Sequence, residues 1–158
     1  MTPLTIHLND EAATLDLGAR LAASLKPGLY IALRGDLGTG KTTLVRGLLR
    51  ALGHHGAVKS PSYSLVEPYA LPEFEFNHFD LYRFRDDSEW HDSGFGDYFG
   101  PDSVCAVEWP EKASALLPDA DIDIALTVEA DGRGARIVAN TAAGQRCITQ
   151  WGTGGDAR

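Results

Sequence analysis

The sequence of 158 residues lacks the features that mark secreted, membrane-spanning and transition-metal proteins. Its two cysteines are too few for a disulfide framework, and we expect Cys105 and Cys147 to be reduced residues packed in the interior. No apolar run approaches the roughly 20 residues that span a bilayer, and the first residues lack the basic start and apolar core of a signal peptide. No HxxxH or CxxC spacing is present. We therefore expect a cytoplasmic protein with no membrane contact and no transition-metal site.

Basic side chains are also scarce. Fourteen Lys and Arg residues stand against 22 Asp and Glu residues, which gives a formal net charge of −8. A negative surface repels phosphate backbones, so a role in RNA metabolism would need a partner protein that holds the RNA. The hydrophobic content of 44% is that of a globular chain. From the length we predict a single domain over residues 1–151, followed by a flexible tail over residues 152–158.

One stretch carries the strongest functional signal. Residues 35–42 match the phosphate-binding pattern G-x-x-x-x-G-K-[ST] with Gly35, Asp36, Leu37, Gly38, Thr39, Gly40, Lys41 and Thr42. The apolar run Leu29–Leu33 before it predicts a buried strand, and apolar residues at helical spacing over Thr42–Leu52 predict a helix after it. This strand, loop and helix order is the context that the pattern requires, so we predict a P-loop, the phosphate-binding loop of nucleotide-binding proteins.

The residue types of the loop explain its chemistry. Its glycines let the backbone turn its N–H groups toward an anion, at the positive end of the following helix. Lys41 is expected to contact the outer phosphates, and the hydroxyl of Thr42 is suited to binding Mg²⁺. Thr43 could donate to the innermost phosphate or only pack locally. The predicted ligand is a nucleoside triphosphate with Mg²⁺.

Two acidic residues at predicted strand ends complete such a site. Glu108 follows the apolar run Val104–Val107, and Asp80 ends the preceding predicted strand. An ionised carboxylate that leaves a buried strand is costly unless a cation or a donor meets it. We expect both to have a metal-binding or catalytic role. The alternative for Glu108 is a surface carboxylate or helix cap, and the alternative for Asp80 is an ion pair with Arg83 or Arg85.

A hydroxyl-rich segment lies between the P-loop helix and the next strand, and it contains Lys59, Ser60, Pro61, Ser62 and Tyr63. Nucleotide switches keep a mobile loop at this position, where it senses the terminal phosphate. The residues alone favour an ordinary solvated loop. Nearby His78 is expected only to pack beside Asp80.

Hydrophobic periodicity predicts the remaining elements. Asp10 is expected to cap a helix over residues 11–25, and an acidic helix or pair of turns is expected over residues 86–99. Strict alternation before a turn at residues 131–134 predicts hairpin-joined strands. Strands are expected at residues 4–8, 29–33, 74–82, 104–107, 121–128, 136–139 and 146–151. The fold class is therefore α/β, a three-layer fold like that of P-loop NTPases, with a mostly parallel central sheet and added antiparallel C-terminal strands.

Four motifs together resemble one family. They are the P-loop at residues 35–43, the segment Val58–Val66, the segment His78–Arg83 and the segment Val107–Glu111. In order and spacing they are similar to those of the TsaE family, also called YjeE, over about residues 4–139. These are small bacterial P-loop ATPases required for the threonylcarbamoyl modification of tRNA adenosine beside the anticodon. The P-loop alone is common, whereas the three later motifs together are much more specific.

The resemblance implies roles for the matching residues. Thr42 and Glu108 resemble the Mg²⁺ ligands of the family, and Asp80 resembles a further acidic group near the metal or the attacking water. The segment from Lys59 to Ser64 is similar to the switch-like loop of the family. Trp109 is similar to its aromatic residue beside the site.

The resemblance also implies the ligand and the partners. Glu11 and Arg133 fall where family members approach the nucleotide, which is expected to be ATP. The protein would act with two partners, TsaB and TsaD, and would meet tRNA only through that complex. Weak ATPase activity is expected of the chain alone, because a partner can supply a group that completes the site.

Two other functions share the P-loop. A small-molecule kinase of this architecture would need an arginine-rich lid and an acceptor pocket, yet the arginines are scattered and the second half of the chain is predicted to form strands. A GTP switch would need a guanine-reading N/T-K-x-D pattern, which the sequence lacks. An ATP hydrolase is therefore the preferred prediction, with the small-molecule kinase as the alternative.

Overall fold

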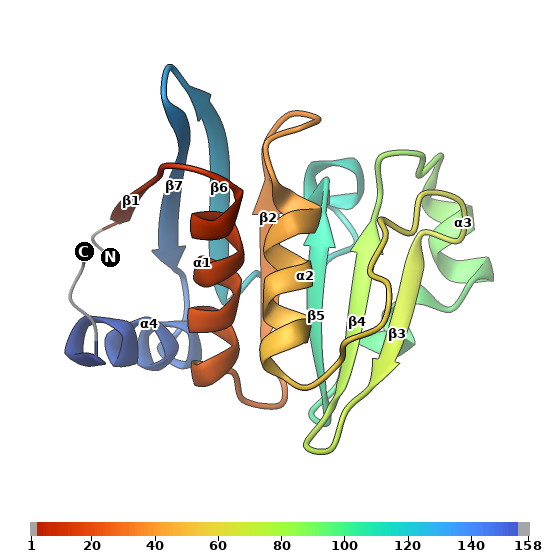
Figure 1. Cartoon of the computed structure of the whole chain (residues 1–158). Helices are drawn as coiled ribbons and strands as arrows, with labels where there is room; N and C mark the ends of the chain where they lie inside the picture. Colours follow the sequence, from red (N-terminus) through yellow and green to blue (C-terminus); the bar gives the residue numbers. More distant parts are fainter. Residues whose placement is uncertain (1–2, 155–158) are drawn as a thin grey trace.

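The structure is a computed structural model that describes residues 3–154. Within this part of the chain, a seven-stranded sheet with the order β1-β7-β6-β2-β5-β4-β3 forms the middle layer (Figure 1). The strands are β1 (Leu4–Leu8), β2 (Tyr30–Arg34), β3 (Val66–Ala70), β4 (Glu75–Asp80), β5 (Ser103–Glu108), β6 (Ile122–Glu129) and β7 (Gly132–Ala139).

The centre of the sheet is parallel and its edges are antiparallel. Strand β2 pairs in parallel with β5 and β6, and β4 pairs in parallel with β5. Strand β3 joins one edge antiparallel to β4, while β7 and β1 extend the other edge in antiparallel pairs. The α/β fold and the antiparallel strands β6 and β7 agree with the sequence prediction. The pairing of β1 with β7, from opposite ends of the chain, was not anticipated.

Helices cover both faces of the sheet. On one face lie α1 (Glu11–Ser24), α2 (Lys41–Ala51) and α4 (Ala142–Gly154), and Figure 1 shows α1 and α2 side by side in front of the strands. The other face is covered by α3 (Asp87–Asp92) and the short 3₁₀ helices η1 (Phe95–Tyr98) and η2 (Pro110–Ala113). The buried apolar residues form one cluster on each face, which gives the predicted three layers.

Two glycines let α1 and α2 approach closely. A Cβ atom on Gly18 would collide with the carbonyl oxygen of Leu44, and one on Gly47 would collide with the carbonyl oxygen of Leu15. Side chains at either position would therefore push the helices apart. Because α2 begins at Lys41, this close contact fixes the position of the phosphate-binding loop against α1.

Helix α4 corrects one prediction. Residues 146–151 were expected to form a strand, but they lie within α4. Cys147 and Trp151 are four residues apart and both buried, which is the spacing of one helix face. The indole Nε1 of Trp151 donates to Oγ of Ser24 at 2.9 Å, and that Oγ lies 2.8 Å from Sγ of Cys147. These contacts with α1 determine the conformation of the segment.

Two further differences concern strands: β3 was not among the predicted strands, and β7 begins at Gly132, within the predicted turn. Other features agree with the sequence. The carboxylate of Asp10 accepts a hydrogen bond from the N–H of Ala13 at 2.9 Å and caps α1 as predicted. The predicted acidic segment forms α3 and η1, separated near Gly94. The predicted tail overlaps the end of α4 over residues 152–154, and residues 155–158 lie outside the described part.

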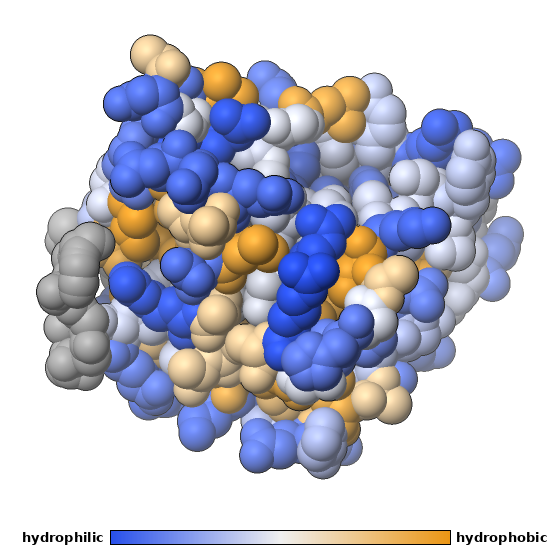
Figure 2. All heavy atoms as spheres, in the orientation of Figure 1, coloured by the Kyte–Doolittle hydropathy of each residue, from blue (hydrophilic) through white to orange (hydrophobic). Residues whose placement is uncertain are grey.

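Both cysteines are free and buried, as predicted. Burial raises the pKa of the Cys105 thiol to about 12 and also raises the pKa of Cys147. The face that carries α1 and α2 is largely hydrophilic, with small apolar areas between polar ones (Figure 2). Of the helices within residues 3–154, none combines the length and the apolar character needed to cross a membrane.

Candidate nucleotide-binding site

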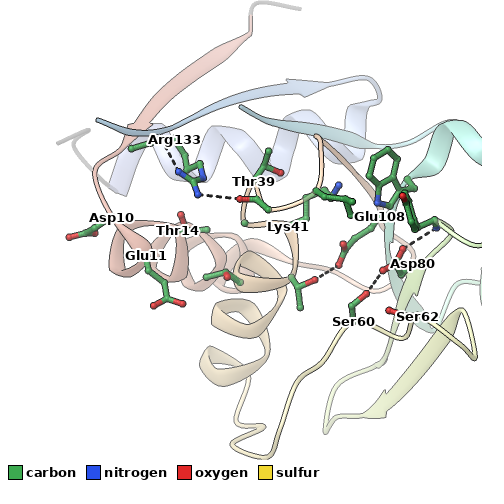
Figure 3. A pocket seen from close by; sticks show the side chains of 18 of the residues that line it. Asp10, Glu11, Thr14, Thr39, Lys41, Ser60, Ser62, Asp80, Glu108 and Arg133 are labelled. Carbon is green, nitrogen blue, oxygen red and sulfur yellow. Dashed lines mark hydrogen bonds between the residues drawn. The ribbon is translucent and has the colours of Figure 1, made fainter. Parts of the chain in front are cut away.

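An open cleft of about 720 Å³ lies at the carboxyl ends of β2, β4 and β5 (Figure 3). It brings together most of the residues singled out in the sequence, although these come from distant segments. The lining residues are Asn9, Asp10, Glu11, Thr14, Leu37, Gly38, Thr39, Gly40, Lys41, Thr42, Thr43, Ser60, Ser62, Asp80, Tyr82, Arg83, Glu108, Trp109, Gly132 and Arg133.

Five of the predicted residues do not line this cleft: Gly35, Asp36, Lys59, Pro61 and Tyr63. Gly35 and Asp36 are the first two residues of the loop, and Asp36 is exposed. Lys59 and Pro61 lie along a separate pocket beside β3. Tyr63 is 87% exposed, and the guanidinium carbon of Arg83 lies over its ring, 5.0 Å from the centroid.

The phosphate-binding loop has the backbone that its glycines allow. Gly35, Gly38 and Gly40 have φ angles of 144°, 79° and 107°, which other residues rarely adopt. Gly40 is also the N-cap of α2, so the free N–H groups of the first helical turn open onto the cleft. This arrangement is an anion-binding site made of backbone donors and the positive helix end.

Lys41 is buried at the edge of this loop. Its Nζ donates to the carbonyl oxygen of Gly35 and, at 3.4 Å, to that of Asp36. The same Nζ lies 4.0 Å from the ring centroid of Trp109. Burial lowers the pKa of Lys41, and the nearby carboxylates of Glu108 and Asp80 oppose that shift. A partly desolvated ammonium of this kind gains strongly from a further anionic neighbour.

The two predicted carboxylates lie side by side on the sheet. Strands β4 and β5 are in register so that Asp80 is opposite Glu108, and both residues are buried. The hydroxyl of Thr42 donates to Oε2 of Glu108 at 2.9 Å. The carboxylate of Glu108 is therefore neither a surface group nor a helix cap.

Asp80 is held by the neighbouring loop and by its own strand end. Its Oδ2 accepts a hydrogen bond from the hydroxyl of Ser60, and its Oδ1 accepts one from the N–H of Tyr82 at 3.0 Å. The structure contains no ion pair between Asp80 and Arg83 or Arg85 among the described residues; Arg85 instead pairs with Glu89 at 3.7 Å. The switch-like segment is thus connected to the carboxylate through Ser60.

The sequence did not reveal the part played by His78. This residue was expected only to pack beside Asp80, yet its Nε2 lies 2.7 Å from Oε2 of Glu108. His78 is opposite Ala106 in the register of β4 and β5, so the contact with Glu108 is diagonal. The sequence did contain one indication of this contact. Residues two apart in a strand point to the same face, so His78 shares the face of Asp80.

The oxygen atoms of this region fit Mg²⁺. Within residues 3–154, no group of three or more His, Cys, Asp and Glu side chains is arranged to hold a metal ion by itself. Mg²⁺ does not need such a cage, because it keeps several waters and binds through one or two carboxylates together with phosphate oxygens. Thr42, Glu108 and Asp80 supply the hydroxyl and carboxylate oxygens of that kind of site.

The far end of the cleft has a different character. Figure 3 shows Glu11 and Arg133 on the side of the loop away from Asp80 and Glu108. Arg133 donates from Nη2 to the carbonyl oxygen of Gly38 and from Nη1 to that of Gly132, both at 3.1 Å. Arg133 therefore connects the β6–β7 hairpin to the phosphate-binding loop and forms one wall of the cleft.

The sheet order, the glycine loop before α2 and the paired carboxylates define a P-loop protein of the α/β class. Comparison with known proteins gives the family within that class. The family model described as "Threonylcarbamoyl adenosine biosynthesis protein TsaE" matches residues 8–137. The chain belongs to the TsaE family.

Individual relatives agree with this assignment. The chain is 42% identical over 154 residues to the tRNA threonylcarbamoyladenosine biosynthesis protein TsaE of Haemophilus influenzae. The aligned region covers 94% of this chain and 98% of that protein. It is 37% identical over 125 residues to the protein of the same name from Bacillus subtilis. The crystal structure of Bacillus subtilis YdiB has a TM-score of 0.83 at 25% identity, with 96% of this chain and 95% of that chain covered.

Proposed function

We propose that the cleft binds ATP together with Mg²⁺ and hydrolyses the ATP slowly. The observation that carries this proposal is the contact between Thr42 and Glu108. It brings the first hydroxyl of α2 and a buried carboxylate together beside a loop of backbone donors. Oxygen ligands for Mg²⁺ and N–H donors for phosphates are needed at adjoining positions in a nucleotide-hydrolysing site.

Each group has a part in the proposed reaction. The N–H groups of residues 38–43 hold the phosphates, and Lys41 exchanges its carbonyl contacts for the outer phosphate oxygens. Thr42 and Glu108 hold Mg²⁺, whose chemistry is to neutralise charge that develops on the transferred phosphoryl group. Asp80 lies beside Glu108 and orients the attacking water by accepting a hydrogen bond from it. Glu11 and Arg133 form the end of the cleft that takes the nucleoside.

The wider role follows from the family. Relatives of this chain are named as tRNA threonylcarbamoyladenosine biosynthesis proteins. We infer that this chain acts in the same modification of tRNA, where its ATP hydrolysis supports a complex of TsaB and TsaD. The net charge of −8 suits a division in which the partners hold the tRNA and this chain contacts it only through them.

The experiment is a phosphate-release assay on the chain alone, with TsaB, with TsaD and with both, at saturating ATP and Mg²⁺. We expect slow hydrolysis by the chain alone and a marked rise only with both partners, and the rise should disappear without Mg²⁺. An unchanged rate on adding both partners would contradict the proposed role in the complex. Transfer of the phosphoryl group to a small metabolite in place of water would favour the kinase alternative.

A further inference from the structure

The ring of His78 lies in the interior beneath the cleft. It is fully buried, and its Nε2 approaches Oε2 of Glu108 to 2.7 Å, the length of a strong hydrogen bond to a carboxylate. Glu108 itself is only 3% exposed. A buried carboxylate depends on its donors, and within the described residues two side chains supply them, His78 and Thr42, both to the same oxygen.

The hydrogen bonds define which nitrogen of His78 carries the proton. Nδ1 is buried and has no hydrogen-bond partner among the described residues. A proton on Nδ1 would leave a buried donor unsatisfied and would set the lone pair of Nε2 against a carboxylate oxygen. The network therefore assigns the proton to Nε2, and His78 is a hydrogen-bond donor to Glu108.

Thr42 and His78 differ in what they can do for Glu108 when Mg²⁺ is bound. The Thr42 hydroxyl has one donor and two lone pairs, so it can ligate a cation while it donates to Oε2. His78 lies behind Glu108 and does not line the cleft, so it does not meet the phosphates. Its donation fixes the direction of the carboxylate and leaves Oε1 without a hydrogen bond among the described residues.

We propose that His78 is a positioning residue that holds Glu108 in the orientation needed for Mg²⁺. The inference rests on the proposed Mg²⁺–ATP site and adds a residue to it. Hydrogen-bond partners of metal ligands typically change metal affinity or activity by about 10–100-fold when they are removed. The competing explanation is that His78 only fills space in the interior.

The neighbouring Asn77 offers a matched control. It is also fully buried in β4, but on the opposite face, where its Nδ2 donates to the carbonyl oxygen of Tyr98 at 3.1 Å. Replacing either residue by Leu removes a buried polar group from the same strand. Only the change at position 78 removes a donor from Glu108. His78→Gln returns an amide donor close to the place of Nε2.

The experiment compares the wild type with His78→Leu, His78→Gln and Asn77→Leu. Thermal unfolding gives the stability of each, calorimetry gives the affinity for ATP without metal, and electron paramagnetic resonance gives the affinity for Mn²⁺ in the presence of a non-hydrolysable ATP analogue. We expect His78→Leu to keep its metal-free ATP affinity and to lose about 10–100-fold in Mn²⁺ affinity. His78→Gln should recover most of that loss, and Asn77→Leu should keep the wild-type Mn²⁺ affinity.

The other outcomes contradict either the role of His78 or the proposed function. Wild-type Mn²⁺ affinity in His78→Leu, or equal losses in His78→Leu and Asn77→Leu, would overturn the role of His78 while the proposed function stands. A wild type without affinity for ATP and Mn²⁺ would overturn the proposed function and this inference together. If His78→Leu does not fold, the ¹⁵N resonances of His78 in the wild type decide, because a ring with a proton on Nδ1 and none on Nε2 cannot donate to Glu108.

Discussion

The hydroxyl of Thr42 donates a hydrogen bond of 2.9 Å to Oε2 of Glu108, a residue 66 positions further along the chain. The contact exists because β2 and β5 are parallel neighbours, so the loop that follows β2 opens beside the end of β5. A crossover connection between parallel strands brings the P-loop and the carboxylate together although the two segments are distant in sequence. The proposed nucleotide chemistry depends on this pair.

Replacing Glu108 by Gln should separate binding from hydrolysis. The amide oxygen can still accept from Thr42, so the fold and ATP binding should persist, while loss of the charge weakens Mg²⁺ binding. We expect phosphate release with both partners to fall by about 10²–10³-fold, the range seen when a transition-state contact is removed. Glu67→Gln, an exposed change on β3, is the control. Wild-type turnover in Glu108→Gln would remove this residue from the site.

Replacing Lys41 by Ala should abolish most of the ATP affinity. The ammonium is buried beside the loop, and a hydrogen bond to a charged group is worth about 1.5–3 kcal/mol. Two such contacts with phosphate oxygens correspond to a loss on the order of 100-fold or more in the dissociation constant. Calorimetry measures the dissociation constant for ATP. Arg50→Ala removes an exposed cation from the same helix and should bind as the wild type does. Equal affinities in the two variants would refute a phosphate contact by Lys41.

Trp109 should report the movement of Lys41. The ammonium lies 4.0 Å from the Trp109 ring centroid, and it must leave the ring if it moves to a phosphate. We expect intrinsic fluorescence to change when ATP and Mg²⁺ are added, and the change should vanish in Trp109→Phe. The other two tryptophans, Trp90 and Trp151, are buried away from the cleft, so replacing them should preserve the change. A signal that survives in Trp109→Phe would show that it arises elsewhere.

Sequence patterns were sufficient to predict the parts of the fold that depend only on residues close together in the chain. The loop at residues 35–42 and the Asp10 cap are readable because specific residue types are needed at fixed spacings. The strand predicted at residues 146–151 was wrong because its buried residues, Cys147 and Trp151, acquire their environment from Ser24 in α1. The contact of His78 with Glu108 depends on the register of β4 and β5, which no local pattern specifies.

Gly47→Ala should destabilise the protein although Ala is the better helix former. The substitution gains about 1 kcal/mol in helix propensity. The added methyl group collides with the backbone of Leu15, which cannot rotate away as a side chain could. We expect a net loss of about 1–3 kcal/mol in the free energy of unfolding, measured by denaturant titration. Arg50→Ala, on the exposed side of the same helix, should change little. Unchanged stability in Gly47→Ala would mean that α1 and α2 are not in close contact there.

The most direct test of the central claim is a crystal structure of the protein with Mg²⁺ and a non-hydrolysable ATP analogue. We predict that the triphosphate lies over the N–H groups of residues 38–43, with Lys41 on its outer oxygens. The metal ion should lie between those oxygens and the side chains of Thr42 and Glu108. A structure with the analogue bound elsewhere, or with the loop empty at saturating analogue and Mg²⁺, would contradict the account.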